Sequence, residues 1–282
     1  MSEIIYLNGE FVAYEDAKIH IEDRGNVYAD GIYEVIRFYN GKPLELIPHL
    51  QRLVRSAASI RLETPPISEL VPAALECVKQ NITGDGTVYI QVTRGVAPRK
   101  HPFPKDVPST IFMIAREVSR PDAEQVAQGV ACITVPDIRW QRCDIKSIAL
   151  LANVLAKQQA IEADAYEAIF VRDGAVTEGS SSNVWAVRNG EIWTHPADWR
   201  ILGGITRDCI LRLAQQEGLT VHQEPVLAAE LATADEIFIT STSTEVMPVI
   251  TLDGKPVGAG RPGPATLCIW QAYDAMVRGA AQ

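Results

Sequence analysis

The chain has 282 residues, of which 47% are hydrophobic and 22% are charged. These are ordinary values for a globular protein and differ from those of disordered chains. A net charge of -9, with no run of basic residues, lacks the electrostatic pattern of proteins that bind nucleic acid or anionic membranes. We therefore expect neither partner.

Five cysteines are scattered along the chain without CxxC spacing. This pattern indicates neither a disulfide framework nor a metal cluster, and it favours a reducing, cytoplasmic compartment. The chain starts without a signal-peptide pattern, and no segment approaches the ~20 apolar residues of a membrane span. We expect no targeting segment and no anchor.

Asn-Gly pairs separate several short apolar runs. The pairs Asn8-Gly9, Asn40-Gly41 and Asn189-Gly190 are typical of two-residue hairpin turns of type I′, and Asp253-Gly254 is a weaker example. Each pair predicts two antiparallel strands.

Segments with helical periodicity are found between these predicted hairpins. Apolar residues recur at three- and four-residue spacing over 46–60, and 67–80 and 148–163 have a similar character. The polar stretch after the apolar run 111–115 contains Pro121 and is the best candidate for a linker. We predict two α+β domains, 1–118 and 126–282, joined by a linker at 119–125.

Lys146 stands between Cys143-Asp144-Ile145 and an apolar run. That context predicts burial, which disfavours the ammonium form and makes a neutral, nucleophilic amine available for condensation with a carbonyl. The alternative is a structural lysine paired with Asp144 at a helix start.

Glu178 lies in the hydroxyl-rich stretch 177–183 between the predicted strands 166–171 and 184–187. One carboxylate in such a connection suits a cation such as a protonated ring nitrogen. The alternative is a polar loop with Glu178 in water.

Two further polar segments suit an anion. Residues 202–208 place two glycines and Thr206 at the start of a helical pattern, and 240–244 provide five consecutive hydroxyls. A helix cap and a polar turn are the alternatives. An anion site also needs a cation, which these two segments lack, and Arg52 is a candidate for it.

Arg99 and His101 share one loop with Lys100 between them. Two donors two residues apart are able to grip one carboxylate, and the alternative is an exposed basic loop. Lys100 has no role that the sequence indicates.

A reactive lysine, a carboxylate for a pyridinium and a phosphate site together describe pyridoxal 5′-phosphate. The segments 135–147, 177–183 and 203–207 also resemble the class IV (fold type IV) aminotransferases. The resemblance runs from about Glu22 to Glu245 and implies the two-domain α+β fold type IV. Several long motifs in the expected order are hard to match by chance.

The resemblance also implies roles for single residues. Lys146 matches the lysine that holds the cofactor covalently and then moves the substrate proton, and Glu178 matches the acid that pairs with the pyridine nitrogen. The residues expected at the cofactor phosphate are Arg52, Ile205, Thr206, Ser241 and Thr242. Leu202 matches an apolar residue against the ring, and Tyr33, Arg99 and His101 match a trap for the substrate carboxylate.

Within the family, the Arg99/His101 pair is similar to that of the members that act on D-amino acids. The implied reaction is ping-pong transamination of D-alanine or D-glutamate with pyruvate or 2-oxoglutarate, in a homodimer whose trap loop enters the partner's site. The alternatives are a branched-chain L-amino acid aminotransferase, an (R)-amine transaminase, an aminodeoxychorismate lyase and a non-catalytic protein. No metal is expected.

Overall fold

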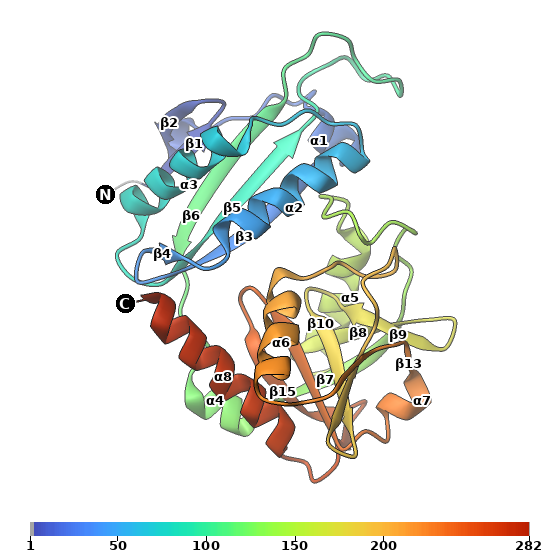
Figure 1. Cartoon of the computed structure of the whole chain (residues 1–282). Helices are drawn as coiled ribbons and strands as arrows, with labels where there is room; N and C mark the ends of the chain where they lie inside the picture. The colour runs from blue at the N-terminus through green and yellow to red at the C-terminus, as the bar shows by residue number, and fades with distance from the viewer. Residues whose placement is uncertain (1–2, 282) are drawn as a thin grey trace. The chain divides into compact units, whose positions relative to one another are not determined.

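A computed structural model describes residues 3–281 of the chain and divides it into two compact units (Figure 1). The first unit holds the chain up to Ser119 together with Ile145–Ala149, and the second holds Arg120–Asp144 and Leu150–Gly279. The short segment 145–149, which contains Lys146, thus belongs to the first unit although the sequence around it belongs to the second.

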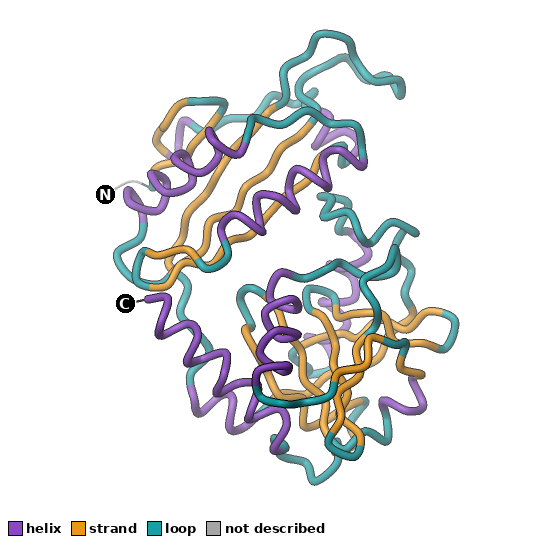
Figure 2. The backbone as a smooth tube through the Cα atoms, viewed as in Figure 1, coloured by secondary structure: helices purple, strands orange, loops and turns teal. Residues whose placement is uncertain are grey.

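A six-stranded antiparallel sheet forms the first unit, in the order β2-β1-β6-β5-β3-β4. Its strands are β1 (Ile4–Leu7), β2 (Glu10–Ala13), β3 (Gly31–Tyr39), β4 (Lys42–Pro43), β5 (Gly86–Thr93) and β6 (Thr110–Glu117). Its helices are η1 (Tyr14–Asp16), α1 (Arg24–Tyr28), α2 (Leu46–Ser59) and α3 (Ile67–Asn81). Helices α2 and α3 cover one face of this sheet (Figures 1 and 2).

The core of the first unit lies between these two helices and the sheet. Ile36 and Phe38 of β3 pack with Leu50 and Leu53 of α2, and all four side chains are fully buried. Because side chains alternate across a strand, Tyr33, Val35 and Arg37 lie on the opposite face of the sheet.

The second unit is built on a ten-stranded sheet that follows the path β12-β11-β10-β14-β15-β7-β8-β9-β13, with β16 paired to β15. Its strands are β7 (Val130–Pro136), β8 (Glu167–Arg172), β9 (Ala175–Gly179), β10 (Asn183–Arg188), β11 (Glu191–Thr194), β12 (Val221–Gln223), β13 (Val226–Leu227), β14 (Glu236–Ser241), β15 (Glu245–Leu252) and β16 (Lys255–Pro256). Its helices are α4 (Ala123–Gln128), α5 (Leu151–Glu162), α6 (Ile205–Gln216), α7 (Ala228–Leu231) and α8 (Pro264–Ala281).

The predicted Asn-Gly and Asp-Gly hairpins are confirmed. The turn residues join β1 to β2, β3 to β4, β10 to β11 and β15 to β16, and every Asn, Asp and Gly among them has a positive φ. Asp173-Gly174, which is not among the predicted turns, makes the same kind of turn between β8 and β9.

Three predicted elements differ from the structure. The helix expected over 148–163 begins only at Leu151, because residues 147 and 148 bond to β3 instead. Glu178 lies within strand β9 and not in a loop. Inside the predicted linker 119–125, Asp122 caps helix α4 by accepting from the Gln125 backbone N–H.

Within residues 3–281, none of the helices combines the length and the apolar character that a membrane crossing requires. The same residues contain no group of three or more His, Cys, Asp or Glu side chains placed to hold a metal ion. All five cysteines are free thiols.

The turn chemistry gives a simple test. Gly9 has a φ of +99° with open space around it, so in Gly9→Ala only the backbone strain matters. We expect the free energy of unfolding to fall by about 1 kcal/mol. Chemical denaturation measures this change. Gly84→Ala is the control, because Gly84 also has open space but no positive φ; a loss as large for Gly84→Ala would contradict the explanation.

Candidate functional site

In the first unit, backbone hydrogen bonds attach the segment around Lys146 to the start of β3. The Tyr33 N–H donates to the Lys146 carbonyl at 3.0 Å, and the Ile148 N–H donates to the Gly31 carbonyl at 3.1 Å. The Lys146 N–H donates to the buried Ser56 hydroxyl of α2 at 3.1 Å. These bonds hold the backbone of Lys146 in one position, although it lies outside any regular helix.

The Lys146 side chain lies against aromatic rings. Its Nζ is 4.1 Å from the centroid of the Tyr33 ring, and Tyr33 stacks on Tyr89 at 5.6 Å. Lys146 is half-buried, so the predicted burial of this lysine is only partial. The alternative pairing with Asp144 is not observed either, since that carboxylate binds Arg142 at 2.8 Å. The amine of Lys146 therefore meets an aromatic face and not the carboxylate of Asp144.

Arg52 belongs to a buried cluster on the core side of β3. Its Nε and Nη2 donate to the two carboxylate oxygens of Glu34 at 2.9 and 2.7 Å, and the His49 Nδ1 lies 3.0 Å from the same carboxylate. Burial alone would raise the pKa of Glu34, but the interactions with Arg52 and His49, including their hydrogen bonds, together outweigh burial and hold this pKa below its ordinary range. Burial also lowers the pKa of His49, so its ring is neutral at pH 7 and acts as a hydrogen-bond donor.

The loop that carries Arg99 and His101 follows β5. Both side chains lie beside Tyr28, with the Arg99 Cζ 5.3 Å and the His101 ring centroid 5.4 Å from its ring. Arg24 anchors the loop by donating to the Lys100 carbonyl at 2.7 Å and to the His101 carbonyl at 3.4 Å. The structure thus brings the two predicted donors together on an exposed loop whose backbone is held by hydrogen bonds from Arg24.

In the second unit, Glu178 projects from β9 into a set of donors. One carboxylate oxygen accepts a short hydrogen bond from Arg139, and the other accepts the Leu202 N–H at 2.9 Å and the Asn183 amide at 3.4 Å. Arg139 is held in turn by Asp137, whose oxygens are 2.9 Å from its Nε and Nη2. Glu178 is buried, and this network determines the direction of its carboxylate.

Of the two predicted anion segments of the second unit, 202–208 lies next to Glu178, because the Leu202 N–H donates to its carboxylate. Helix α6 begins at Ile205, its N-cap Gly204 supplies no side-chain cap, and Thr206 is buried in the first turn. A 12-residue helix without such a cap leaves N–H donors of its first turn for an anion. Ser241 ends β14, where its hydroxyl accepts the Thr244 N–H at 3.0 Å.

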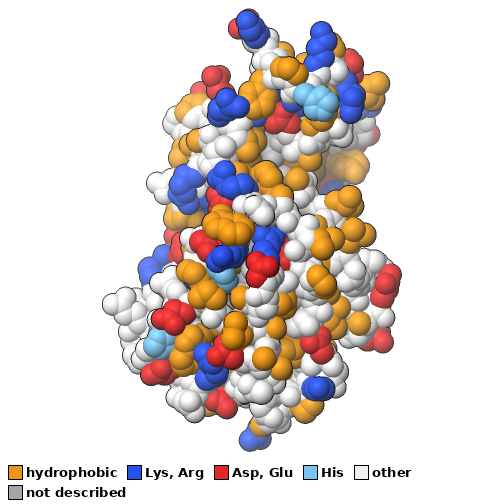
Figure 3. Space-filling model, turned by 90° about the vertical axis from the view of Figure 1, so that its right-hand side faces the viewer, with side chains coloured by type: hydrophobic (Ala, Val, Ile, Leu, Met, Phe, Trp, Pro, Cys, Tyr) orange, Lys and Arg blue, Asp and Glu red, His pale blue; other side chains and the backbone are white. Residues whose placement is uncertain are grey.

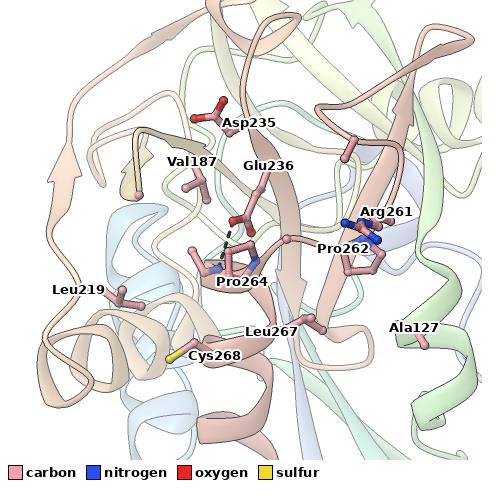
Figure 4. Close-up of a pocket in the computed structure, with 14 residues that line it drawn as sticks. Ala127, Val187, Leu219, Asp235, Glu236, Arg261, Pro262, Pro264, Leu267 and Cys268 are labelled. Carbon is pink, nitrogen blue, oxygen red and sulfur yellow. Dashed lines mark hydrogen bonds between the residues drawn. The ribbon is translucent and has the colours of Figure 1, made fainter.

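A hollow in the second unit lies elsewhere. It is lined by Ala127, Val187, Gly190, Leu219, Asp235, Glu236, Ala259, Arg261, Pro262, Gly263, Pro264, Ala265, Leu267 and Cys268. In Figure 4 the Glu236 carboxylate points to the start of α8, where it accepts the N–H groups of Ala265 and Thr266 at 3.1 and 2.8 Å. Glu236 therefore serves as a helix cap, and none of the predicted site residues lines this hollow.

The surface charge is mixed. On the face drawn in Figure 3, Lys and Arg side chains are interspersed with Asp and Glu. Charges of both signs at this spacing do not create a strong field of one sign over that face.

The family model for amino-transferase class IV matches residues 31–252. The chain belongs to the class IV aminotransferases. The D-alanine aminotransferase of Staphylococcus haemolyticus is 44% identical over 272 residues, with 96% of both chains covered. The D-alanine aminotransferase of Bacillus licheniformis is 46% identical over 263 residues, with 93% of both chains covered.

A solved structure of this family has the same fold. The branched-chain aminotransferase of the thermophilic archaeon Thermoproteus uzoniensis, with norvaline, matches with a TM-score of 0.90 and 28% identity, covering 99% of this chain and 96% of that one. The predicted two-domain α+β fold of type IV is confirmed.

Class IV aminotransferases use pyridoxal 5′-phosphate, and the residues of this chain suit that cofactor. A half-buried amine suits its aldehyde, an oriented carboxylate suits its ring nitrogen, and a helix start without a side-chain cap suits its phosphate. The predicted cofactor therefore agrees with the chemistry of the donors.

Sequence reasoning missed the partners of the predicted residues. Glu34, His49 and Arg139 hold Arg52 and Glu178 in place, but no local pattern marks them. Glu34 occupies an inward position of an apolar strand. Because buried carboxylates are almost always paired, a charged residue at such a position is the one sequence signal that a buried ion pair exists there.

The Glu34 cluster predicts a pH dependence of stability. The folded pKa of Glu34 lies below its unfolded value near 4.5, so its contribution is complete above that value and is lost as the pH falls below it. At pH 7, Glu34→Gln should lower the free energy of unfolding by about 3 kcal/mol, because it leaves Arg52 buried without its counter-charge.

Urea denaturation between pH 3 and pH 7 measures the effect. The difference between wild type and Glu34→Gln should shrink as the pH falls below about 4.5. Glu63→Gln is the control, because Glu63 is an exposed carboxylate of the same unit. A difference that is independent of pH would refute the electrostatic explanation.

Proposed function

We propose that the chain catalyses transamination between D-amino acids and 2-oxo acids, with D-alanine and D-glutamate as amino donors and pyruvate and 2-oxoglutarate as acceptors. The observation that carries this proposal is the 44–46% identity to D-alanine aminotransferases over nearly the whole chain. The branched-chain aminotransferase structure of the same fold is 28% identical.

The loop after β5 supports the same assignment. Arg99 and His101 meet beside Tyr28 on a loop anchored by Arg24, and this pair provides two donors for one substrate carboxylate. A branched-chain L-amino acid aminotransferase and an (R)-amine transaminase remain the alternatives on this fold.

In the first unit, we assign the amine chemistry to Lys146. Its amine would hold the cofactor through the aldehyde and would serve as the general base that takes the proton from the substrate Cα. Its backbone is fixed by Ser56 and Tyr33, so the amine moves only through its own side-chain torsions. Tyr33, Arg99 and His101 bind the substrate carboxylate. Arg52 binds the phosphate and is oriented for this by Glu34.

In the second unit, we assign to Glu178 the hydrogen bond with the pyridine nitrogen. The bound cofactor supplies an electron sink for the charge left when the Cα proton is removed. Arg139 and the Leu202 N–H hold the Glu178 carboxylate in one orientation, so it is preorganised for this partner. The Ile205 amide and the hydroxyls of Thr206, Ser241 and Thr242 would hold the phosphate, and Leu202 would provide an apolar side chain for the ring.

We further propose a cytoplasmic homodimer in which the Arg99 loop of one subunit completes the site of the other. The loop residues 99–101 are exposed, and the side chain of Phe103 beyond them is 44% exposed. Sedimentation of the purified protein measures the assembly.

The function is tested with a panel of D-alanine, D-glutamate, L-leucine and L-glutamate, following the cofactor absorbance in single half-reactions. We expect conversion by the two D-amino acids and little or none by L-leucine. Conversion by L-leucine in preference to D-alanine would favour the branched-chain alternative.

Lys146→Ala should remove the covalent link to the cofactor and nearly all turnover, because the variant has no amine at this position to act as the general base. The expected loss is at least ~10²–10⁴-fold in rate. Borohydride reduction of the wild type, followed by peptide mapping, should place the label on Lys146. Lys157→Ala, on helix α5, is the control, and a label on another peptide would overturn the assignment.

Arg99→Ala should raise KM for both the amino donor and the oxo-acid acceptor, since each presents the same carboxylate to the loop. Losing one charge-assisted hydrogen bond corresponds to roughly a 10- to 100-fold change. Steady-state kinetics with D-alanine and 2-oxoglutarate measure it. Lys100→Ala is the matched control, because the structure engages only the backbone carbonyl of Lys100; equal effects of the two variants would contradict the assignment.

A further inference from the structure

Arg207 is a buried cation in the first turn of helix α6. Its side chain is 1% exposed, and its Nη2 donates to the His195 carbonyl and to the Gln223 side chain, each at 3.0 Å. Its Nη1 lies 3.9 Å from a carboxylate oxygen of Asp208, whose side chain is 55% exposed. The guanidinium is thus bonded to neutral acceptors inside the unit, and its carboxylate partner is in contact with water.

This position is unfavourable for a cation. The first turn of a helix carries a partial positive charge, which repels a cation placed there, and removing a guanidinium from water adds a further cost. Gly204, the N-cap of α6, supplies no side-chain acceptor. A buried cation beside a helix start without such a cap favours an anion at Ile205 and Thr206.

The guanidinium also lies over an indole ring. The Arg207 Cζ is 5.9 Å from the centroid of the Trp185 ring, and the Trp185 Nε1–H donates to the Thr240 hydroxyl at 2.9 Å. Trp185 is fully buried and stacks on Phe238 with ring centroids 5.4 Å apart. The cation is attracted to the indole face, and the indole in turn fixes the Thr240 side chain.

These contacts join the two anion segments of the second unit, which are far apart in the sequence. Arg207 follows Thr206 on α6, and Thr240 precedes Ser241 at the end of β14. Trp185 belongs to β10, which pairs with β14 in the sheet, and α6 packs against β14. Arg207 and Trp185 therefore form a buried link between the helix start and the strand end.

We propose that Arg207 and Trp185 are positioning residues, which hold residues 205–206 and 241–242 at the separation that one phosphate group needs. This inference rests on the proposed function, which assigns the cofactor phosphate to these two segments. A phosphate group is compact, so donors from two elements bind it together only if the elements keep a fixed spacing. Side chains behind the donors supply that preorganisation.

The test compares pyridoxal 5′-phosphate with pyridoxal, which lacks only the phosphate. Titration of the cofactor-free full chain, followed by the absorbance of the bound ligand, measures both affinities without turnover. Wild type should bind pyridoxal 5′-phosphate far more tightly than pyridoxal. Trp185→Phe keeps an aromatic ring but removes the donor to Thr240, so it should weaken pyridoxal 5′-phosphate about 10-fold and leave pyridoxal unchanged.

Three further variants test the link itself. Thr240→Val removes the other partner of the same hydrogen bond, so it should have the same effect as Trp185→Phe, and the double variant should bind no more weakly than either single one. Arg207→Met should weaken pyridoxal 5′-phosphate roughly 10- to 100-fold with pyridoxal unchanged. Arg207→Lys retains the charge and should recover part of this loss. The substitutions at 185 and 240 keep the test decisive if Arg207→Met does not fold.

Arg188→Met and Trp193→Phe are the matched controls. Arg188 also lies over an indole, with its Cζ 4.5 Å from the centroid of the Trp193 ring. It binds Glu230 at 2.9 Å, so this second pair connects β10 and β11 to α7 and not to α6. Both variants should keep the wild-type ratio of the two affinities.

Three outcomes overturn the proposal: equal affinity of wild type for both ligands, a loss in Trp185→Phe that is absent or equal for both ligands, or additive effects of Trp185→Phe and Thr240→Val. The D-alanine half-reaction separates this inference from the proposed function. Absence of any D-alanine reaction in wild type would overturn the proposed function, whereas a loss that depends on the phosphate would still assign Arg207 and Trp185.

Discussion

Attachment of the segment 145–149 to the beginning of β3 is the constraint on which the chemistry of the first unit depends. Two backbone hydrogen bonds to Tyr33 and Gly31, and one to Ser56, hold a piece of chain that is remote in sequence. Without them, Lys146 would be a lysine in a connecting loop with no fixed position relative to β3. With them, its amine lies over Tyr33, on the face of the sheet opposite the hydrophobic core.

The buried charges differ in how they are satisfied. Glu34 and Arg52 neutralise each other inside the first unit, and Arg139 is shared between Asp137 and Glu178 in the second. These pairs orient side chains that are assigned to the cofactor. Arg37 is a buried arginine without a hydrogen-bonded partner among the described residues.

Much of the fold was predictable because the signals are local. The turn residues with positive φ and the apolar periodicity of 46–60 and 67–80 each depend on a few neighbouring residues, so hairpins and helices were placed closely. The start of α5 was wrong because residues 147 and 148 bond to β3, a long-range interaction that no local pattern encodes. The predicted loop position of Glu178 is wrong for a similar reason, since the short strand β9 is defined by its pairing with β8.

The same distinction between local patterns and long-range interactions applies to the candidate site. The sequence by itself determined the kinds of groups present, a lysine, a carboxylate, a helix start without a side-chain cap and an Arg-x-His loop, because these are properties of residue types and their spacing. Only the tertiary structure decided which partners orient them, that Lys146 is half-buried, and that Arg37 lacks a hydrogen-bonded partner among the described residues. The physical reason is that burial and pairing of charge depend on residues brought together from distant parts of the chain, and these contacts exist only after folding.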